Sequence, residues 1–94
     1  MHVRVELLGL SRLVTGTREV SLELPDGATY RDLVYALSEA YPGLVGNVIQ
    51  ADRRNLQAPN IFNLNARQMV QSRQMDNRLA EDDRIILMSI SAGG

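Results

Sequence analysis

Apolar and charged residues alternate strictly at the start of the chain, and the pattern returns near residue 20. Val3, Val5 and Leu7 alternate with charged residues, as in a strand that buries one face. The same alternation recurs over residues 19–24. Turn-forming residues, including Gly16, occupy the connection, so the two strands are predicted to form a β-hairpin.

A helix is predicted after the turn-forming sequence Pro25-Asp26-Gly27. Thr29 is a suitable N-cap, and Asp32 stands three residues later in a variant of the capping box. Apolar residues then recur at helical spacing, at Tyr30, Leu33, Val34, Leu37 and Ala40. Pro42 and Gly43 end the helix, because proline cannot continue it and glycine accepts a left-handed turn.

The middle of the chain has weaker periodicity. A short helical turn is predicted within residues 44–49, and an irregular surface loop over residues 51–60. Residues 61–64 are predicted to form a strand. A tight turn over 65–67 then leads into a second short strand at 68–70.

The most apolar run lies near the end of the chain. Residues 71–77 are polar and are expected to form a loop, and Leu79 is an isolated apolar residue before the acidic turn 81–83. Residues 85–90 have the length and composition of a central strand covered on both faces. Residues 91–94 have no bulky side chains and are expected to leave the domain as a flexible tail.

This order of elements predicts an α+β fold. The 94 residues suit one domain, expected over residues 1–90, with the tail at 91–94. A helix packs on one face of a mixed sheet, and the last strand is central. The first and last strands would be parallel neighbours, a geometry that needs a crossover connection. The helix and the middle of the chain provide it.

The composition limits the chemistry that the chain performs by itself. It contains no cysteine, so a disulfide, a thiolate metal site and a cysteine nucleophile are all excluded. His2 is the only histidine and is expected to be solvated; no group of residues has the spacing of a metal site. We find no acid/base pair, activated nucleophile or phosphate-binding loop. The chain is therefore not expected to be an enzyme by itself.

The charges also limit the partners. The net charge is −1, and all ten basic residues are arginines, which are scattered along the chain. This distribution is unlike a nucleic-acid-binding surface. No segment resembles a signal peptide or is long enough to cross a membrane, so a cytoplasmic protein is expected.

Four segments together resemble the MoaD/ThiS family of ubiquitin-like sulfur carriers. They are the opening strand 3–9, the helix start 25–33, the leucine, acidic turn and strand start 79–85, and the final Gly93-Gly94. The resemblance covers nearly all of the chain except residues 51–60, and it implies a ubiquitin-like β-grasp fold. Two positions depart from the family pattern. Asp82 stands where a glycine is usual, and Ser89-Ile90 stand where many molybdopterin-type members have two prolines.

The resemblance implies that Gly94 is the reacting residue. In this family an E1-like adenylyltransferase activates the terminal carboxylate with ATP and Mg, and a sulfur donor acting through a partner converts it to a thiocarboxylate. No cofactor is expected on this chain. Gly93 lets the tail pass closely between channel walls, and Ser91 and Ala92 are expected to contact the partner there.

The leading expectation for the pathway is the small subunit of molybdopterin synthase, acting in molybdenum cofactor biosynthesis with the large subunit as its partner. A thiamine-biosynthesis carrier that serves thiazole synthase is the nearest alternative. A ubiquitin-like modifier conjugated through Gly94 is a second alternative. A binding module that uses the sheet face without the tail is the third.

A docking surface is predicted from the strand alternation. Leu8 and Met88 fall on the sides of their strands that carry charged residues, away from the helix. With Met69 nearby they are expected to form an exposed apolar patch that binds partners. The alternative is that the loop 71–77 covers them.

Overall fold

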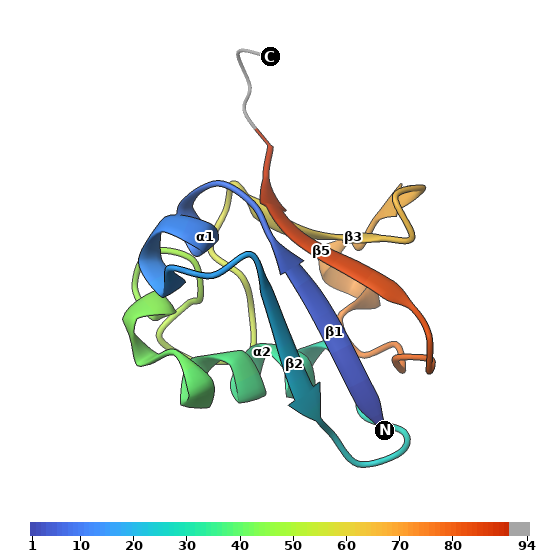
Figure 1. Cartoon of the computed structure of the whole chain (residues 1–94). Coiled ribbons are helices and arrows are strands. Elements are labelled where there is room, and N and C mark those ends of the chain that lie inside the picture. Colours follow the sequence, from blue (N-terminus) through green and yellow to red (C-terminus); the bar gives the residue numbers. More distant parts are fainter. Residues whose placement is uncertain (91–94) are drawn as a thin grey trace.

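The protein is a five-stranded mixed sheet with one long helix across one face, seen in a computed structural model that describes residues 1–90 (Figure 1). The strands are β1 (His2–Leu7), β2 (Glu19–Glu23), β3 (Asn60–Leu64), β4 (Gln68–Met69) and β5 (Arg84–Ser89). The helices are α1 (Leu10–Thr15) and α2 (Tyr30–Ala40), with 3₁₀ turns η1 (Pro42–Leu44) and η2 (Ser72–Gln74). The predicted α+β architecture is confirmed.

The sheet has the strand order β2-β1-β5-β3-β4, which places the last strand at its centre. β1 runs parallel to β5, with Val5 opposite Ile85 and Leu7 opposite Leu87. β2 pairs antiparallel with β1, and β3 pairs antiparallel with β5. The predicted hairpin pairing, the central last strand and the parallel pairing of first and last strands are all confirmed.

The core lies between α2 and one face of the sheet. Leu33, Val34 and Leu37 of α2 are fully buried there. The sheet contributes alternate residues from its three inner strands and the segment after β4, namely Val3, Val5, Leu7, Ile85, Leu87, Phe62 and Val70. The Tyr30 and Phe62 rings lie 5.9 Å apart between centroids, so α2 is anchored to the sheet at its first turn.

The capping box predicted for α2 is present. The Thr29 hydroxyl accepts a hydrogen bond from the backbone N–H of Asp32 at 3.3 Å. The Asp32 carboxylate accepts one from the backbone N–H of Thr29 at 2.8 Å. These two bonds satisfy backbone donors that a helix start otherwise leaves without partners.

The segment between β1 and β2 differs from the prediction of turns alone, because residues 10–15 form the short helix α1. Gly9 and Gly16 flank it with positive φ values of 68° and 74°, which glycine adopts at little cost. The buried Ser11 hydroxyl donates to the Leu8 carbonyl at 3.1 Å. A six-residue helix is too short to show a periodic pattern, and its packing against η1 and β5 stabilises it.

The loops match the prediction in outline. The helical turn predicted within 44–49 lies earlier, at η1, while Val48 and Ile49 are buried. The tight turn between β3 and β4 is confirmed, with positive φ at Asn65 and Ala66. Asp82 has a φ of 68°, which aspartate tolerates better than most residues, and this allows it to replace glycine in the acidic turn.

Replacing Thr29 by alanine is expected to destabilise the protein by about 1 kcal/mol, because the cap of α2 is lost. Chemical unfolding curves of the purified variant measure this. Asp32→Ala should cost a similar amount, and the double variant should cost less than the two single changes together. Fully additive effects would show that the two side chains do not act as one cap.

Candidate functional site

The strand β5 leads toward the tail on which the predicted chemistry depends. Ile90 is the last described residue, and its N–H donates to the Pro59 carbonyl at 2.9 Å. β5 therefore carries the chain to one end of the sheet (Figure 1). The predicted reacting residues Gly93 and Gly94, and the predicted contact residues Ser91 and Ala92, lie outside the described residues. Their roles stay predictions.

The sheet face opposite α2 carries the predicted docking residues. The pairing register places Glu6, Ile86, Asn63 and Met69 in one row across β1, β5, β3 and β4. Residues opposite each other in register share a face of the sheet. The row that contains Val5 and Ile85 points toward α2 instead, into the core.

Leu8 and Met88 are neighbours on this face. The Leu8 N–H donates to the Leu87 carbonyl at 3.0 Å, which extends the parallel pairing by one residue beyond β1. Leu8 is 44% exposed, while Met88 and Met69 are half-buried. The three residues lie on one face as expected, although Asn63 and Ile86 separate Met69 from the other two. Partner binding by this face stays a prediction.

The alternative, in which the loop 71–77 covers the patch, is wrong. This loop packs on the α2 side of the sheet, where its backbone carbonyls at Met75 and Asn77 accept hydrogen bonds from Arg31 and Tyr30. Met75 is buried in the core. The loop follows β4 but folds back toward the start of α2, which leaves Leu8 exposed.

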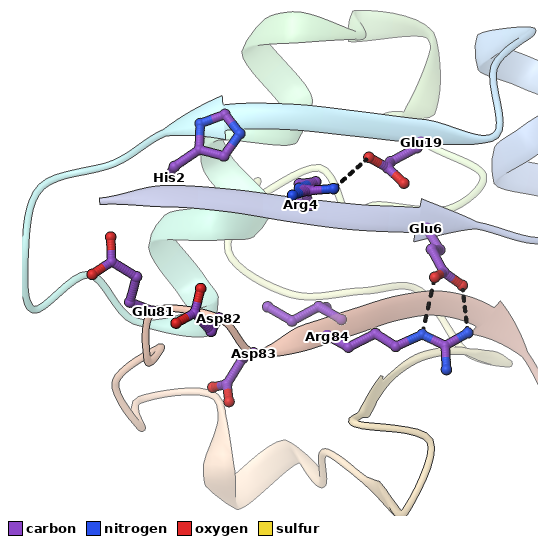
Figure 2. Close-up of a pocket in the computed structure, with 9 residues that line it drawn as sticks. His2, Arg4, Glu6, Glu19, Glu81, Asp82, Asp83 and Arg84 are labelled. Carbon is purple, nitrogen blue, oxygen red and sulfur yellow. Dashed lines mark hydrogen bonds and ion pairs between the residues drawn. The ribbon is translucent and has the colours of Figure 1, made fainter.

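Charged residues occupy the other end of the same face. They line a hollow of about 360 Å³, where Arg84 faces Glu6 and Arg4 faces Glu19 (Figure 2). The acidic turn Glu81, Asp82 and Asp83 lines the far side of the hollow. Arg84 binds Glu6 with two hydrogen bonds of 2.9 and 3.1 Å. Arg4 lies 4.0 Å from Glu19. The face is therefore apolar at the tail end and predominantly acidic at the other.

The Arg84 guanidinium lowers the pKa of Glu6, chiefly through its hydrogen bonds. In the same way, the hydrogen bond from His2 at 2.7 Å lowers the pKa of Glu23 on β2. Both carboxylates are thus held in their charged form. These are exposed interactions, so they orient side chains more than they stabilise the fold.

The described residues contain no group of three potential ligands arranged to hold a metal ion. The acidic turn uses its carboxylates locally. Asp83 accepts hydrogen bonds from the Ala80 N–H at 3.1 Å and from the Asn65 side chain at 3.4 Å. Over residues 1–90, no helix is long and apolar enough to span a membrane.

Sequence reasoning missed two features of the surface. Asn63 is only 8% exposed although it lies on the open sheet face. The alternation of β3 places Asn63 on the face opposite Phe62, and this was the sequence signal for its position. Leu10 and Leu13 of α1 are exposed, Leu13 to 81%. Their spacing of three residues is helical, but it was too short a pattern to identify α1.

The mixed sheet with central β5, the single long helix and the open face define a ubiquitin-like β-grasp protein. The ThiS family model matches residues 5–94, so the chain belongs to the ThiS family. The resemblance to the MoaD/ThiS carriers is thereby confirmed. No curated protein matches the chain in sequence.

Solved structures share the fold. SAMP1 from Haloferax volcanii has a TM-score of 0.81 at 23% identity, with both chains covered fully. The Pyrococcus furiosus protein assigned as molybdopterin converting factor, subunit 1, has a TM-score of 0.73 at 20% identity, with 96% of this chain and 98% of that chain covered. A chain of the BexX/CysO complex of Amycolatopsis orientalis has a TM-score of 0.69 at 19% identity, covering 97% and 98%. At these identities the likeness shows the fold alone.

The Arg84–Glu6 pair predicts how Glu6 titrates. In the folded protein its pKa lies below the ordinary value of 4.5, so the pair stabilises the fold above that pH. The stabilisation is lost as the pH falls through the lowered pKa. In Arg84→Gln the pKa of Glu6 should return toward its ordinary value, as measured by a carbon-detected NMR titration of the carboxyl group.

Arg4→Gln is the matched control for this titration, since Arg4 contacts Glu19 rather than Glu6. It should leave the pKa of Glu6 unchanged. An equal rise in both variants would mean that general loss of positive charge, and not the hydrogen bonds from Arg84, sets this pKa.

Met88→Asp is expected to weaken binding to the E1-like adenylyltransferase at least about tenfold. The reason is that an unpaired carboxylate would be buried in the interface with that enzyme. Calorimetric titration with the partner measures this. Ser21→Asp adds the same charge to an exposed position on the same face at β2, and it should change the affinity by less than about twofold. Normal binding by Met88→Asp would show that the apolar patch is not part of the interface.

Proposed function

We propose that this protein is a sulfur carrier whose C-terminal carboxylate on Gly94 is adenylated and then converted to a thiocarboxylate. Membership of the ThiS family is the observation that carries the proposal. A carboxylate is a poor electrophile. Its attack on ATP forms an acyl-adenylate and releases pyrophosphate, and sulfide from a donor then displaces AMP from the carbonyl carbon. The resulting thiocarboxylate donates its sulfur to a substrate.

The fold supports this use of the tail. β5 is held between two strands, by β1 over residues 84–87 and by β3 over residues 85–89. Ile90 is fixed at the sheet end by its hydrogen bond to Pro59, and residues 91–94 come next in the sequence. The sheet thus fixes the point from which residues 91–94 continue. The small residues of that segment suit a narrow channel in a partner enzyme.

Docking of the open sheet face complements insertion of the tail. Fixing the backbone of four residues costs roughly 4–8 kcal/mol. Hydrogen bonds within the channel and burial of the Leu8 and Met88 side chains offset this cost. In this proposal the partner performs the catalysis, and this chain positions the reacting group as a carrier.

Within the family we propose the role of molybdopterin synthase small subunit, with Gly94 acting inside the large subunit. Likeness to the Pyrococcus furiosus protein assigned as molybdopterin converting factor, subunit 1, over 98% of its length supports this choice. Chain length also favours it slightly over a thiamine-type carrier, because those carriers tend to be more compact.

A ubiquitin-like modifier is the second candidate. Likeness to SAMP1, which is described as small archaeal modifier protein 1, favours it specifically. In that role Gly94 would be joined to lysines of target proteins. This chain contains no lysine, so it would not form chains through its own side chains. Adducts in cell extract that require Gly94 distinguish the modifier from the carrier.

Deletion of Gly94 is expected to abolish sulfur loading and leave folding unchanged. The measurement is the intact mass of protein purified from cells that also make the adenylyltransferase and a sulfur donor. The full chain should gain the mass difference between sulfur and oxygen on its terminal peptide, and the truncated chain should gain nothing. Sulfur loading of the truncated chain would contradict the proposal.

A further inference from the structure

One buried polar group on the open sheet face has no partner within the described part of the chain. The Asn63 side chain is 8% exposed, and its Oδ1 atom is buried without a hydrogen bond. Its Nδ2 atom donates only to the Met69 sulfur at 3.5 Å, and a thioether is a weak acceptor.

Asn63 points away from the core. It lies in the row between Ile86 and Met69, whereas the neighbouring residues Phe62 and Leu64 belong to the helix side. Replacing an unsatisfied buried amide by an apolar group of similar shape is close to neutral or stabilising. Asparagine is therefore a poor choice for the stability of the isolated domain. A partner that supplies a hydrogen bond would offset this cost.

We infer that Asn63 Oδ1 accepts a hydrogen bond from a protein partner docked on the open sheet face. The partner surface is apolar, contains one donor near its centre, and carries basic side chains along the margin that meets the acidic hollow. The Met69 side chain moves aside, because its flexible thioether holds the amide only weakly. The donor then replaces a weak contact with a full hydrogen bond inside an apolar interface.

The charge distribution favours this kind of partner over a second copy of the chain. The hollow beside Glu6 holds five carboxylates and two guanidinium groups, so two such faces would bring like charges together. A basic margin on a different protein is complementary. If the protein has the proposed function, this partner is the adenylyltransferase that activates Gly94. The identity of the partner therefore rests on the proposed function.

The test compares Asn63→Leu with wild type in calorimetric titrations against the adenylyltransferase from the same organism. The variant should bind about tenfold more weakly, the effect of losing one hydrogen bond from a desolvated site. Its midpoint of urea unfolding should equal or exceed that of wild type. If Asn63 had only a structural role, Asn63→Leu would not lower the affinity for the enzyme while leaving the stability of the fold equal or higher.

Asn60→Leu is the matched control on the same strand. Asn60 lies on the helix side of β3, and its amide already donates to the Gln57 carbonyl at 2.8 Å. This variant should unfold at lower urea concentration and bind the enzyme within about twofold of wild type. If Asn63→Leu does not fold, Asn63→Ala removes the same amide with less added volume, and the same loss of affinity is expected.

Equal affinity of Asn63→Leu and wild type would overturn the inference, as would absence of any binding between wild type and this enzyme. Self-association of wild type in sedimentation experiments, lost in Asn63→Leu, would also overturn it by identifying a second copy as the occupant. Sulfur loading is measured separately by intact mass. Wild type that binds the enzyme through Asn63 but never gains sulfur would contradict the proposed function and leave this inference intact.

Discussion

The parallel pairing of β1 with β5 is the constraint on which the rest of the structure depends. Parallel neighbours cannot be joined by a tight turn, so the chain must cross one face of the sheet between them. α2 makes that crossing, and its buried residues form the core with the sheet. The same pairing places β5 between β1 and β3. The last strand is therefore held by a neighbouring strand on each side.

The crossover also explains why the two faces of the sheet differ. One face is closed by α2 and is almost entirely apolar. The other face is left without a covering element among residues 1–90, and it combines apolar side chains, an unsatisfied amide and an acidic hollow. Such a mixture contributes little to the stability of an isolated domain. It is the composition expected of a surface with an apolar centre and a polar rim.

Much of this architecture was predictable from the sequence, because its signals are local and repeated. Strand alternation identified β1 and β2, and a continuous apolar run identified β5. The side chains of Thr29 and Asp32 marked the start of α2. α1 was missed because its stability comes from packing against η1 and β5, which no local pattern reveals. The faces of Leu8 and Met88 followed from alternation, but the isolation of the Asn63 amide depends on neighbours from other strands.

The position of β5 has a mechanical consequence. A pulling force on the C-terminal end of β5 acts along the axis of a strand that is paired on both sides, over residues 84–87 with β1 and over residues 85–89 with β3. Many hydrogen bonds then share the force in shear. When a hairpin is peeled open, by contrast, the force acts on one hydrogen bond at a time. A pull on the chain at Ile90 is therefore resisted by the sheet as a whole.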